Sequence, residues 1–119
     1  MKYMLLMYAN ESQAPEYSPE EFQAIAQAWY AFGQEAKAAG VWLSNNGLCP
    51  VADATTVRVR DGKTLITDGP YAETHEQLGG YYVLDCKDLD EAIGWAAKIP
   101  TAKHGSIEVR PLNQWSQAQ

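Results

Sequence analysis

Apolar residues in the first third of the chain recur at a helical spacing. Ser18 followed by Pro19, with Glu21 three residues after the serine, is typical of a capping box with proline at the first helical position. Gly40 suits the left-handed conformation that ends many helices. A helix over 19–39 is therefore predicted. Its expected buried stripe, at the i, i+3, i+4, i+7 spacing, is Phe22, Ile25, Ala26, Trp29, Phe32, Gly33 and Ala36.

The same reasoning predicts a second helix near the C-terminus. Asp88, with Glu91 three residues later, caps its start, and Pro100 ends it. Its expected buried stripe is Leu89, Ala92, Ile93, Ala96 and Ala97.

Strands are predicted where apolar runs or period-two alternation occur between these helices. Asp61-Gly62 supplies the positive φ angles of a two-residue hairpin turn, whereas Asn45-Asn46-Gly47 is expected to break a strand. Gly79-Gly80 indicates a bulge or close backbone packing. The predicted strands are residues 3–8, 41–44, 55–60, 64–67, 81–84 and 106–112.

The order of these elements predicts one α+β domain over residues 1–119. Each end of the chain reads as strand, capped helix and strand, which is the split βαβ repeat of a ferredoxin-like fold, here with an inserted β-hairpin between the halves. We expect an antiparallel sheet with two helices on one face.

Two strands do not alternate, and this extends the prediction to assembly. Residues 3–8 and 81–84 are apolar on both sides, although two helices on one face can cover only that face. Leaving about six large side chains in water would cost ~1.5–3 kcal/mol each. We therefore expect a homodimer with two sheets packed face to face, a dimeric α+β barrel.

Composition and charge exclude several function classes. The formal net charge is −6 and no run of Lys or Arg offsets it, so nucleic acid is not an expected partner. No segment reaches the roughly 20 apolar residues that span a bilayer, so no membrane association is expected. Cys49 and Cys86 lack CxxC spacing and are expected to be reduced packing residues of a cytoplasmic protein.

The strongest candidate site is the turn at 68–76, which holds five ionisable side chains in nine residues. Gly69-Pro70 fixes its backbone, and a rigid turn could hold the Asp68 carboxylate in a cleft as a catalytic base. The alternative for Asp68 is an Asx-type turn or cap. His75 and Glu73 are candidate assisting groups, because a histidine beside carboxylates suits proton transfer; a solvated loop histidine is the alternative.

Further polar and aromatic residues are candidates for holding a ligand. Glu108 and Arg110 share one face of the last strand, where they either pair with each other or bind a polar group. His104 is taken as a loop residue. The histidines and carboxylates match no metal signature, and no cofactor is expected. The candidate ligand-binding residues are Gly69, Pro70, Tyr71, Glu76, Tyr81, Glu108 and Arg110.

These segments together resemble the DGPF branch of the YCII-related family. The resemblance is carried by Asp-Gly-Pro-Tyr-Ala-Glu-Thr at 68–74, Glu-Gln-Leu-Gly-Gly-Tyr-Tyr at 76–82, Asp-Leu-Asp-Glu-Ala at 88–92 and Gly-Ser-Ile-Glu-Val-Arg-Pro-Leu at 105–112, with Tyr-Met-Leu-Leu at 3–6. It implies a bacterial protein with a dimeric ferredoxin-like fold. The branch is similar to small muconolactone isomerase-like enzymes, some with a His/Asp pair. The histidine of that pair belongs to the first helix, which has none here.

Two functions follow as hypotheses. In the first, the protein binds or transforms a small polar organic molecule by isomerase- or lyase-like acid–base chemistry, with Asp68 as the base and Arg110 neutralising an anionic group. In the second, suggested by the resemblance, it is a non-catalytic regulatory or accessory module associated with an alternative sigma factor.

Overall fold

The fold was analysed in a computed structural model, which describes residues 1–113 and 115. The α+β class, with two helices and antiparallel pairing, is confirmed. The strands are β1 (Lys2–Ala9), β2 (Trp42–Gly47), β3 (Thr55–Arg60), β4 (Lys63–Asp68), β5 (Gln77–Asp85) and β6 (Ser106–Pro111). The α-helices are α1 (Pro19–Ala38) and α2 (Leu89–Lys98), and the short 3-10 helices are η1 (Glu11–Gln13), η2 (Val51–Asp53) and η3 (Pro100–Lys103).

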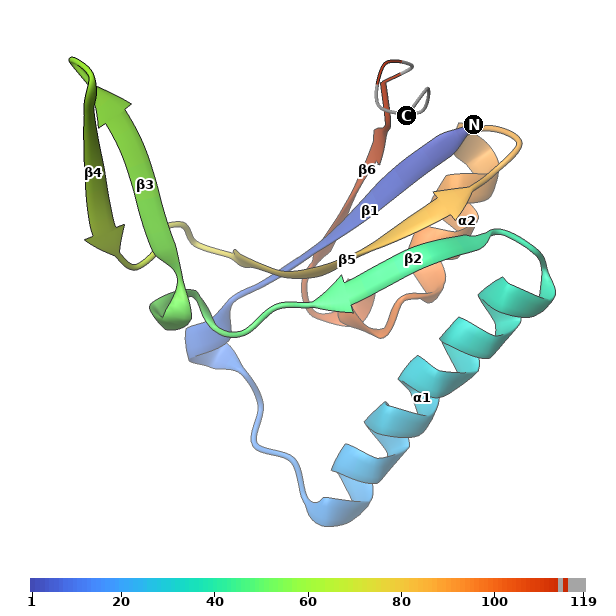
Figure 1. The fold of residues 1–119 in the computed structure, drawn as a ribbon. Helices are drawn as coiled ribbons and strands as arrows, with labels where there is room; N and C mark the ends of the chain where they lie inside the picture. The colour runs from blue at the N-terminus through green and yellow to red at the C-terminus, as the bar shows by residue number, and fades with distance from the viewer. Residues whose placement is uncertain (114, 116–119) are drawn as a thin grey trace.

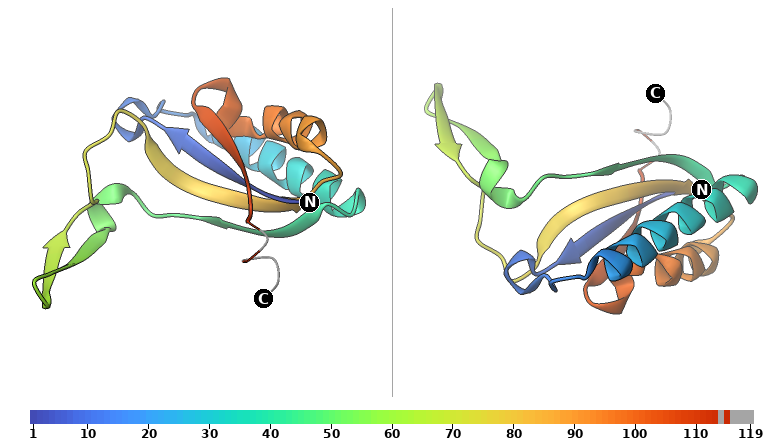
Figure 2. Two further views of the ribbon diagram at one scale, coloured as in Figure 1. Left: turned by 90° about the horizontal axis from the view of Figure 1, so that it is seen from above. Right: turned by 90° about the horizontal axis from the view of Figure 1, so that it is seen from below.

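Four strands form the main sheet in the order β2-β5-β1-β6, with every neighbouring pair antiparallel. This order is consistent with a ferredoxin-like fold. Both helices lie on one side of the sheet (Figures 1 and 2). β3 and β4 form a separate two-stranded sheet that projects from the main sheet, on the side away from the helices (Figure 2).

The capping box of α1 is confirmed, but its buried stripe is only partly correct. The Ser18 side chain accepts from the Glu21 amide at 3.1 Å, and Glu21 Oε1 accepts from the Ser18 amide. Of the predicted stripe only Phe32 and Ala36 are buried, whereas Phe22 is 68% exposed. The N-terminal half of α1 stands away from the sheet (Figure 1), so that its apolar face has no partner there.

The predicted stripe of α2 needs a similar correction. Ala92 and Ala96 are buried as expected, but Leu89 and Ile93 are about half exposed and Ala97 is also exposed. The buried aromatic residue is Trp95. The predicted stripe, made of small and aliphatic residues, is rotated away from the face that α2 buries. The third buried residue, Trp95, meets Phe32 of α1 edge-on, with ring centroids 6.1 Å apart.

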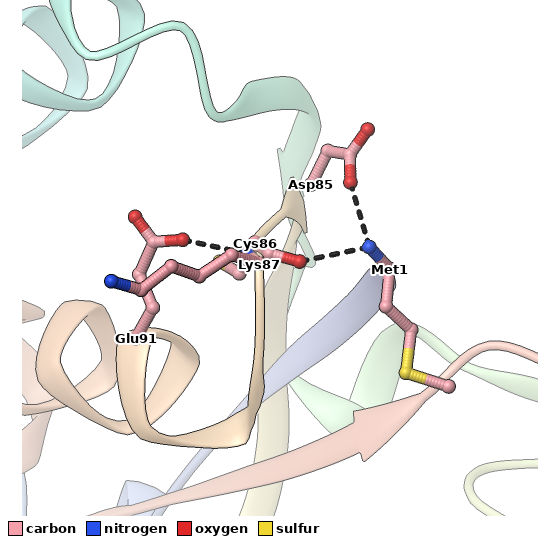
Figure 3. A network of polar contacts seen from close by, with 5 residues as sticks. All are labelled: Met1, Asp85, Cys86, Lys87 and Glu91. Carbon is pink, nitrogen blue, oxygen red and sulfur yellow. Dashed lines mark hydrogen bonds and ion pairs between the residues drawn. The ribbon is translucent and has the colours of Figure 1, made fainter.

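A network of polar contacts ties the start of β1 and the end of β5 to α2 (Figure 3). The Met1 ammonium donates to Asp85 Oδ1 at 3.1 Å and to the Cys86 carbonyl at 2.8 Å. At the N-terminus of α2, Asp88 Oδ1 accepts from the Glu91 amide at 2.9 Å. The Glu91 side chain in turn accepts from the Lys87 amide, through Oε1, at 2.7 Å.

Two strands are longer than predicted because glycine and asparagine take part in the sheet. Asn45, Asn46 and Gly47 continue β2 and pair with β5, and β5 itself includes Gly79-Gly80. A Cβ on Gly80 would lie 2.8 Å from the Asn46 carbonyl oxygen. The predicted bulge is also present, between Met7 and Tyr8 of β1, opposite this pair of glycines.

The hairpin of β3 and β4, residues Thr55–Asp68, is called the arm below. Its turn residues Asp61 and Gly62 both have positive φ, as the two-residue turn requires. Every residue of β4 is exposed. The arm therefore has no core of its own in the single chain.

The helix-free face of the main sheet is apolar at its centre, as the lack of alternation predicted. Tyr3, Leu5 and Met7 are buried beneath the helices, whereas the residues between them are only half-buried. The cross-strand partners of Met4 and Leu6 in β5 are Val83 and Tyr81. Those side chains form a continuous apolar strip on the face opposite the helices.

Within residues 1–113 and 115, no helix has the length and apolarity needed to cross a membrane.

The closest backbone approach involves Gly105, at the start of β6. A Cβ at this position would overlap the Tyr8 carbonyl oxygen, so we expect Gly105→Ala to lower the free energy of unfolding by about 1–3 kcal/mol. The control is Gly33→Ala in α1, where a Cβ meets no atom within 4 Å and should stabilise the helix by about 0.5–1 kcal/mol. Denaturant unfolding of both variants measures this, and equal stability of Gly105→Ala and wild type would contradict it.

Candidate functional sites

Two cavities flank the same end of the main sheet, where β1 ends and β5 begins. One, of about 300 Å³, lies on the helix side and is called the helix-side cavity. The other, of about 680 Å³, lies between the sheet and the arm and is called the arm-root cavity. Gln77 lines both. Both volumes are within the usual range for small-molecule pockets.

Aromatic side chains form much of the wall of the helix-side cavity. The rings of Trp29 and Tyr82 are parallel within 3°, with their centroids 6.4 Å apart. Phe32 meets the Tyr82 ring edge-on at 4.9 Å and so fixes its orientation from behind. The cavity is lined by Met7, Ala9, Glu11, Trp29, Asn45, Asn46, Gly47, Gln77, Gly79, Tyr82, Thr101 and His104.

Tyr82, His104 and Thr101 line this cavity with side chains that make no hydrogen bond to another described residue. Tyr82 is only 5% exposed, and no residue within 1–113 or 115 hydrogen-bonds to its hydroxyl. Burial raises the pKa of Tyr82, so the phenol stays neutral and can donate. The exposed His104 follows η3, and its imidazole likewise has no hydrogen-bond partner among the described residues.

The side chains of Asn45, Gln77 and Glu11 in the helix-side cavity are already hydrogen-bonded. Asn45 Oδ1 accepts from Trp42 Nε1 at 2.8 Å. Gln77 Oε1 accepts from the Glu11 amide at 2.9 Å, and the Glu11 carboxylate accepts from the Val51 amide at 3.1 Å. These bonds hold the cavity wall in shape.

The arm-root cavity holds three of the predicted ligand-binding residues, Pro70, Tyr71 and Glu76. Glu76 is half-buried, and its Oε1 accepts from Ser106 Oγ at 2.9 Å. Tyr71 is 75% exposed. The full lining is Tyr8, Leu48, Cys49, Pro50, Val51, Asp53, Ala54, Thr55, Thr56, Val57, Pro70, Tyr71, Ala72, Thr74, Glu76, Gln77 and Leu78.

The three residues predicted to be catalytic lie outside both cavities. Asp68 ends β4 and is exposed, as are Glu73 and His75. Gly69 has a φ of 103°, donates to the Ala54 carbonyl at 2.7 Å and accepts from the Thr56 hydroxyl at 2.8 Å. The single chain does not gather Asp68, Glu73 and His75 around a common cavity.

The other predicted ligand-binding residues are placed on the helix-free face of the sheet. Arg110 Nη2 donates to Glu108 Oε1 at 2.7 Å, so these two charges pair with each other. The Tyr81 hydroxyl accepts from Asn46 Nδ2 at 2.9 Å. None of the three lines either cavity.

Sequence reasoning missed the helix-side cavity. From the sequence, Trp29 and Tyr82 are predicted as core residues and His104 as a loop residue. The useful signal was Gly105: its contact with the backbone of Tyr8 brings the residue before it to the end of the sheet. The backbone amides of His104 and Gly105 both donate to the Thr101 carbonyl, which fixes that position.

No three His, Cys, Asp or Glu side chains among the described residues lie close enough together to hold a metal ion. The two cysteines are unpaired thiols, Cys49 exposed and Cys86 buried.

Known proteins resemble this chain over nearly its whole length. The family model for the YCII-related domain matches residues 1–116. The chain belongs to the YCII-related family. It is also similar to an uncharacterised protein of Rhizobium meliloti strain 1021, with 40% identity over 114 residues, which is 94% of this chain and 92% of that protein. The relative's description names no activity.

The two thiols should differ sharply in reactivity. Burial, with nearby Glu91 and Asp85, raises the pKa of Cys86 to about 11, so at pH 8 its reactive thiolate is a small minority. Cys49 is exposed in the wall of the arm-root cavity. With Ellman's reagent at pH 8 we expect one thiol to react without unfolding, and the second only in denaturant. Loss of the fast phase in Cys49→Ser identifies it; persistence of that phase would contradict the assignment.

Proposed function

We propose that this YCII-related protein binds a small, flat, uncharged organic molecule in the helix-side cavity and catalyses a proton transfer on it, as isomerases and lyases do. The observation that carries the proposal is the Tyr82 hydroxyl, which belongs to a buried residue in the cavity wall and has no hydrogen-bond partner among the described residues. No fully buried side-chain oxygen or nitrogen among those residues lacks a partner, so this hydroxyl is accessible. A ligand oxygen in the cavity would accept a hydrogen bond from it.

The shape of the cavity favours a flat ligand. The parallel rings of Trp29 and Tyr82 present two aromatic faces with one orientation, and aromatic or conjugated molecules stack on such faces. The volume of about 300 Å³ is at the small end for ligand pockets. A single ring or a short conjugated chain therefore fits the site better than a nucleotide or a peptide.

The charges around the cavity favour a neutral ligand. Its described lining contains no Lys or Arg, and Glu11 contributes a carboxylate. The protein as a whole carries a net charge of −6. An anionic ligand would be repelled by this field and would find no fixed cation to pair with.

His104 and Tyr82 can take complementary roles in a proton transfer. The imidazole of His104 can accept a proton from carbon next to a carbonyl group, because a histidine exchanges protons near neutral pH. The negative charge then develops on the carbonyl oxygen, and the neutral phenol of Tyr82 can donate a hydrogen bond to it. Return of the proton to a different carbon gives an isomerase; loss of a leaving group gives a lyase.

The test uses the fact that the chain has only two histidines. A library of neutral cyclic ketones, lactones and phenols is screened against the protein by following the imidazole resonances in NMR spectra. We expect binders to shift the resonances of His104 and to leave those of His75 unchanged. His75→Gln assigns the signals and serves as the matched control, since His75 lines neither cavity.

The variants Tyr82→Phe and His104→Gln separate binding from chemistry. Removal of the Tyr82 hydroxyl should weaken binding of a carbonyl compound by about tenfold, the value of one hydrogen bond of ~1–1.5 kcal/mol. His104→Gln should retain binding but lose hydrogen–deuterium exchange at the carbon next to the carbonyl. Binders that shift only His75, or exchange that survives in His104→Gln, would refute the proposal.

A further inference from the structure

We propose that the arm-root cavity is completed by a second copy of this chain, held by the arm, so that each cavity is enclosed between two subunits. This proposal concerns the other side of β5 and does not depend on the chemistry assigned to the helix-side cavity. It rests on the surface area of the single chain, the apolar face of the arm, and the continuity of that face with the cavity wall and the sheet.

The single chain exposes more surface than a compact monomer of its mass. Its accessible surface is 8405 Å² at 13.2 kDa, whereas a compact monomer of that mass exposes about 6,400 Å². The excess of about 2,000 Å² per chain would give a total of about 4,000 Å² in a dimer, as in obligate homodimers. The radius of gyration, 16.5 Å, exceeds the roughly 13.5 Å of a compact chain of this length.

One face of the arm accounts for part of this excess. Val57 and Ile66 are cross-strand partners, and Val59 lies two residues along the same face. Their exposed fractions are 60% for each valine and 69% for Ile66. Val57 also lines the arm-root cavity, so this face continues into the cavity wall.

The cavity wall in turn continues into the uncovered face of the sheet. Tyr8 and Leu78 are cross-strand partners beyond the bulge, and both line the arm-root cavity. The arm projects on the helix-free side of the sheet (Figure 2). The arm, the cavity and the apolar strip of the sheet thus form one continuous surface, which a single partner would cover together.

The area to be covered favours a second copy as that partner, since the excess surface matches what an obligate homodimer buries. The basic side chains of the arm do not oppose this contact, because Arg58, Arg60 and Lys63 lie with Leu65 on the face opposite Val57 and Ile66. In a two-fold dimer the same contact forms twice, once from each arm.

Cys49 reports whether the cavity is covered, because it lines the cavity and is exposed in the single chain. The experiment measures its rate of modification by Ellman's reagent, with no ligand present, at protein concentrations from about 0.1 to 100 µM. Sedimentation velocity on the same samples gives the mass. We expect the rate to fall at least about tenfold as the dimer forms.

Two variants test the arm against a matched control on its opposite face. Val57→Asp combined with Ile66→Asp should abolish the protection of Cys49 and weaken the dimer, whereas Leu65→Asp should leave both unchanged. Leu65 is 47% exposed and pairs with Arg58 on the other face of the arm. Ile66→Lys alone serves if the double variant folds poorly, since Ile66 contributes little to packing within its own chain.

Leu6→Asp removes the second copy by a different route, through the sheet, and should also free Cys49. A monomer at every concentration would overturn the proposal. A dimer in which Cys49 reacts as fast as in the double arm variant would overturn the closure of the cavity. Equal loss of protection in Leu65→Asp would overturn the assignment of the arm's face.

Discussion

The structure depends on the alternation of side chains along β1, which stands in the middle of the main sheet. Tyr3, Leu5 and Met7 are buried against the helices, and the residues between them, also apolar, face away from the helices. A strand with two apolar faces requires cover on both. The helices supply one cover and so determine the core of the chain, and the uncovered face is the basis for proposing a second copy.

The helices leave one end of their side of the sheet uncovered, and the helix-side cavity lies at that end. α1 contributes buried residues only from Phe32 onward, while its earlier turns stand away from the sheet (Figure 1). Trp29 is at the point of divergence, so one face of its ring remains available beside Tyr82. An aromatic pocket is therefore a consequence of where the helix leaves the sheet, and of the rings that happen to lie at that place.

The sequence predicted the elements better than their environment. Signals that are local in the chain were correct: the capping box of Ser18 and Glu21, the turn at Asp61-Gly62, and the bulge near Gly79-Gly80. The buried stripes of the helices were partly wrong, because periodicity says which residues share a face but not how far along the helix that face has a partner. Phe22 is the clearest example.

The predicted site illustrates the same limit. Both cavities lie at the end of the sheet where the site was predicted, but the residues chosen were those clustered in sequence. Asp68, Glu73 and His75 are close along the chain and exposed in the fold. Tyr82 and His104 are 22 positions apart, by their numbers, and only the pairing of β1 with both β5 and β6 brings their segments to one end.

A single extra residue explains why that end carries two cavities instead of one. In an unbroken strand, Leu78 would share a face with Gly80 and Tyr82, because side chains alternate with period two. The bulge opposite Met7 and Tyr8 shifts the register, so Leu78 pairs with Tyr8 on the helix-free side. Leu78 then lines the arm-root cavity, and Gly79, without a side chain, lines the helix-side cavity. Filling the bulge position with a large side chain would close the helix-side cavity, which is a physical reason for glycine there.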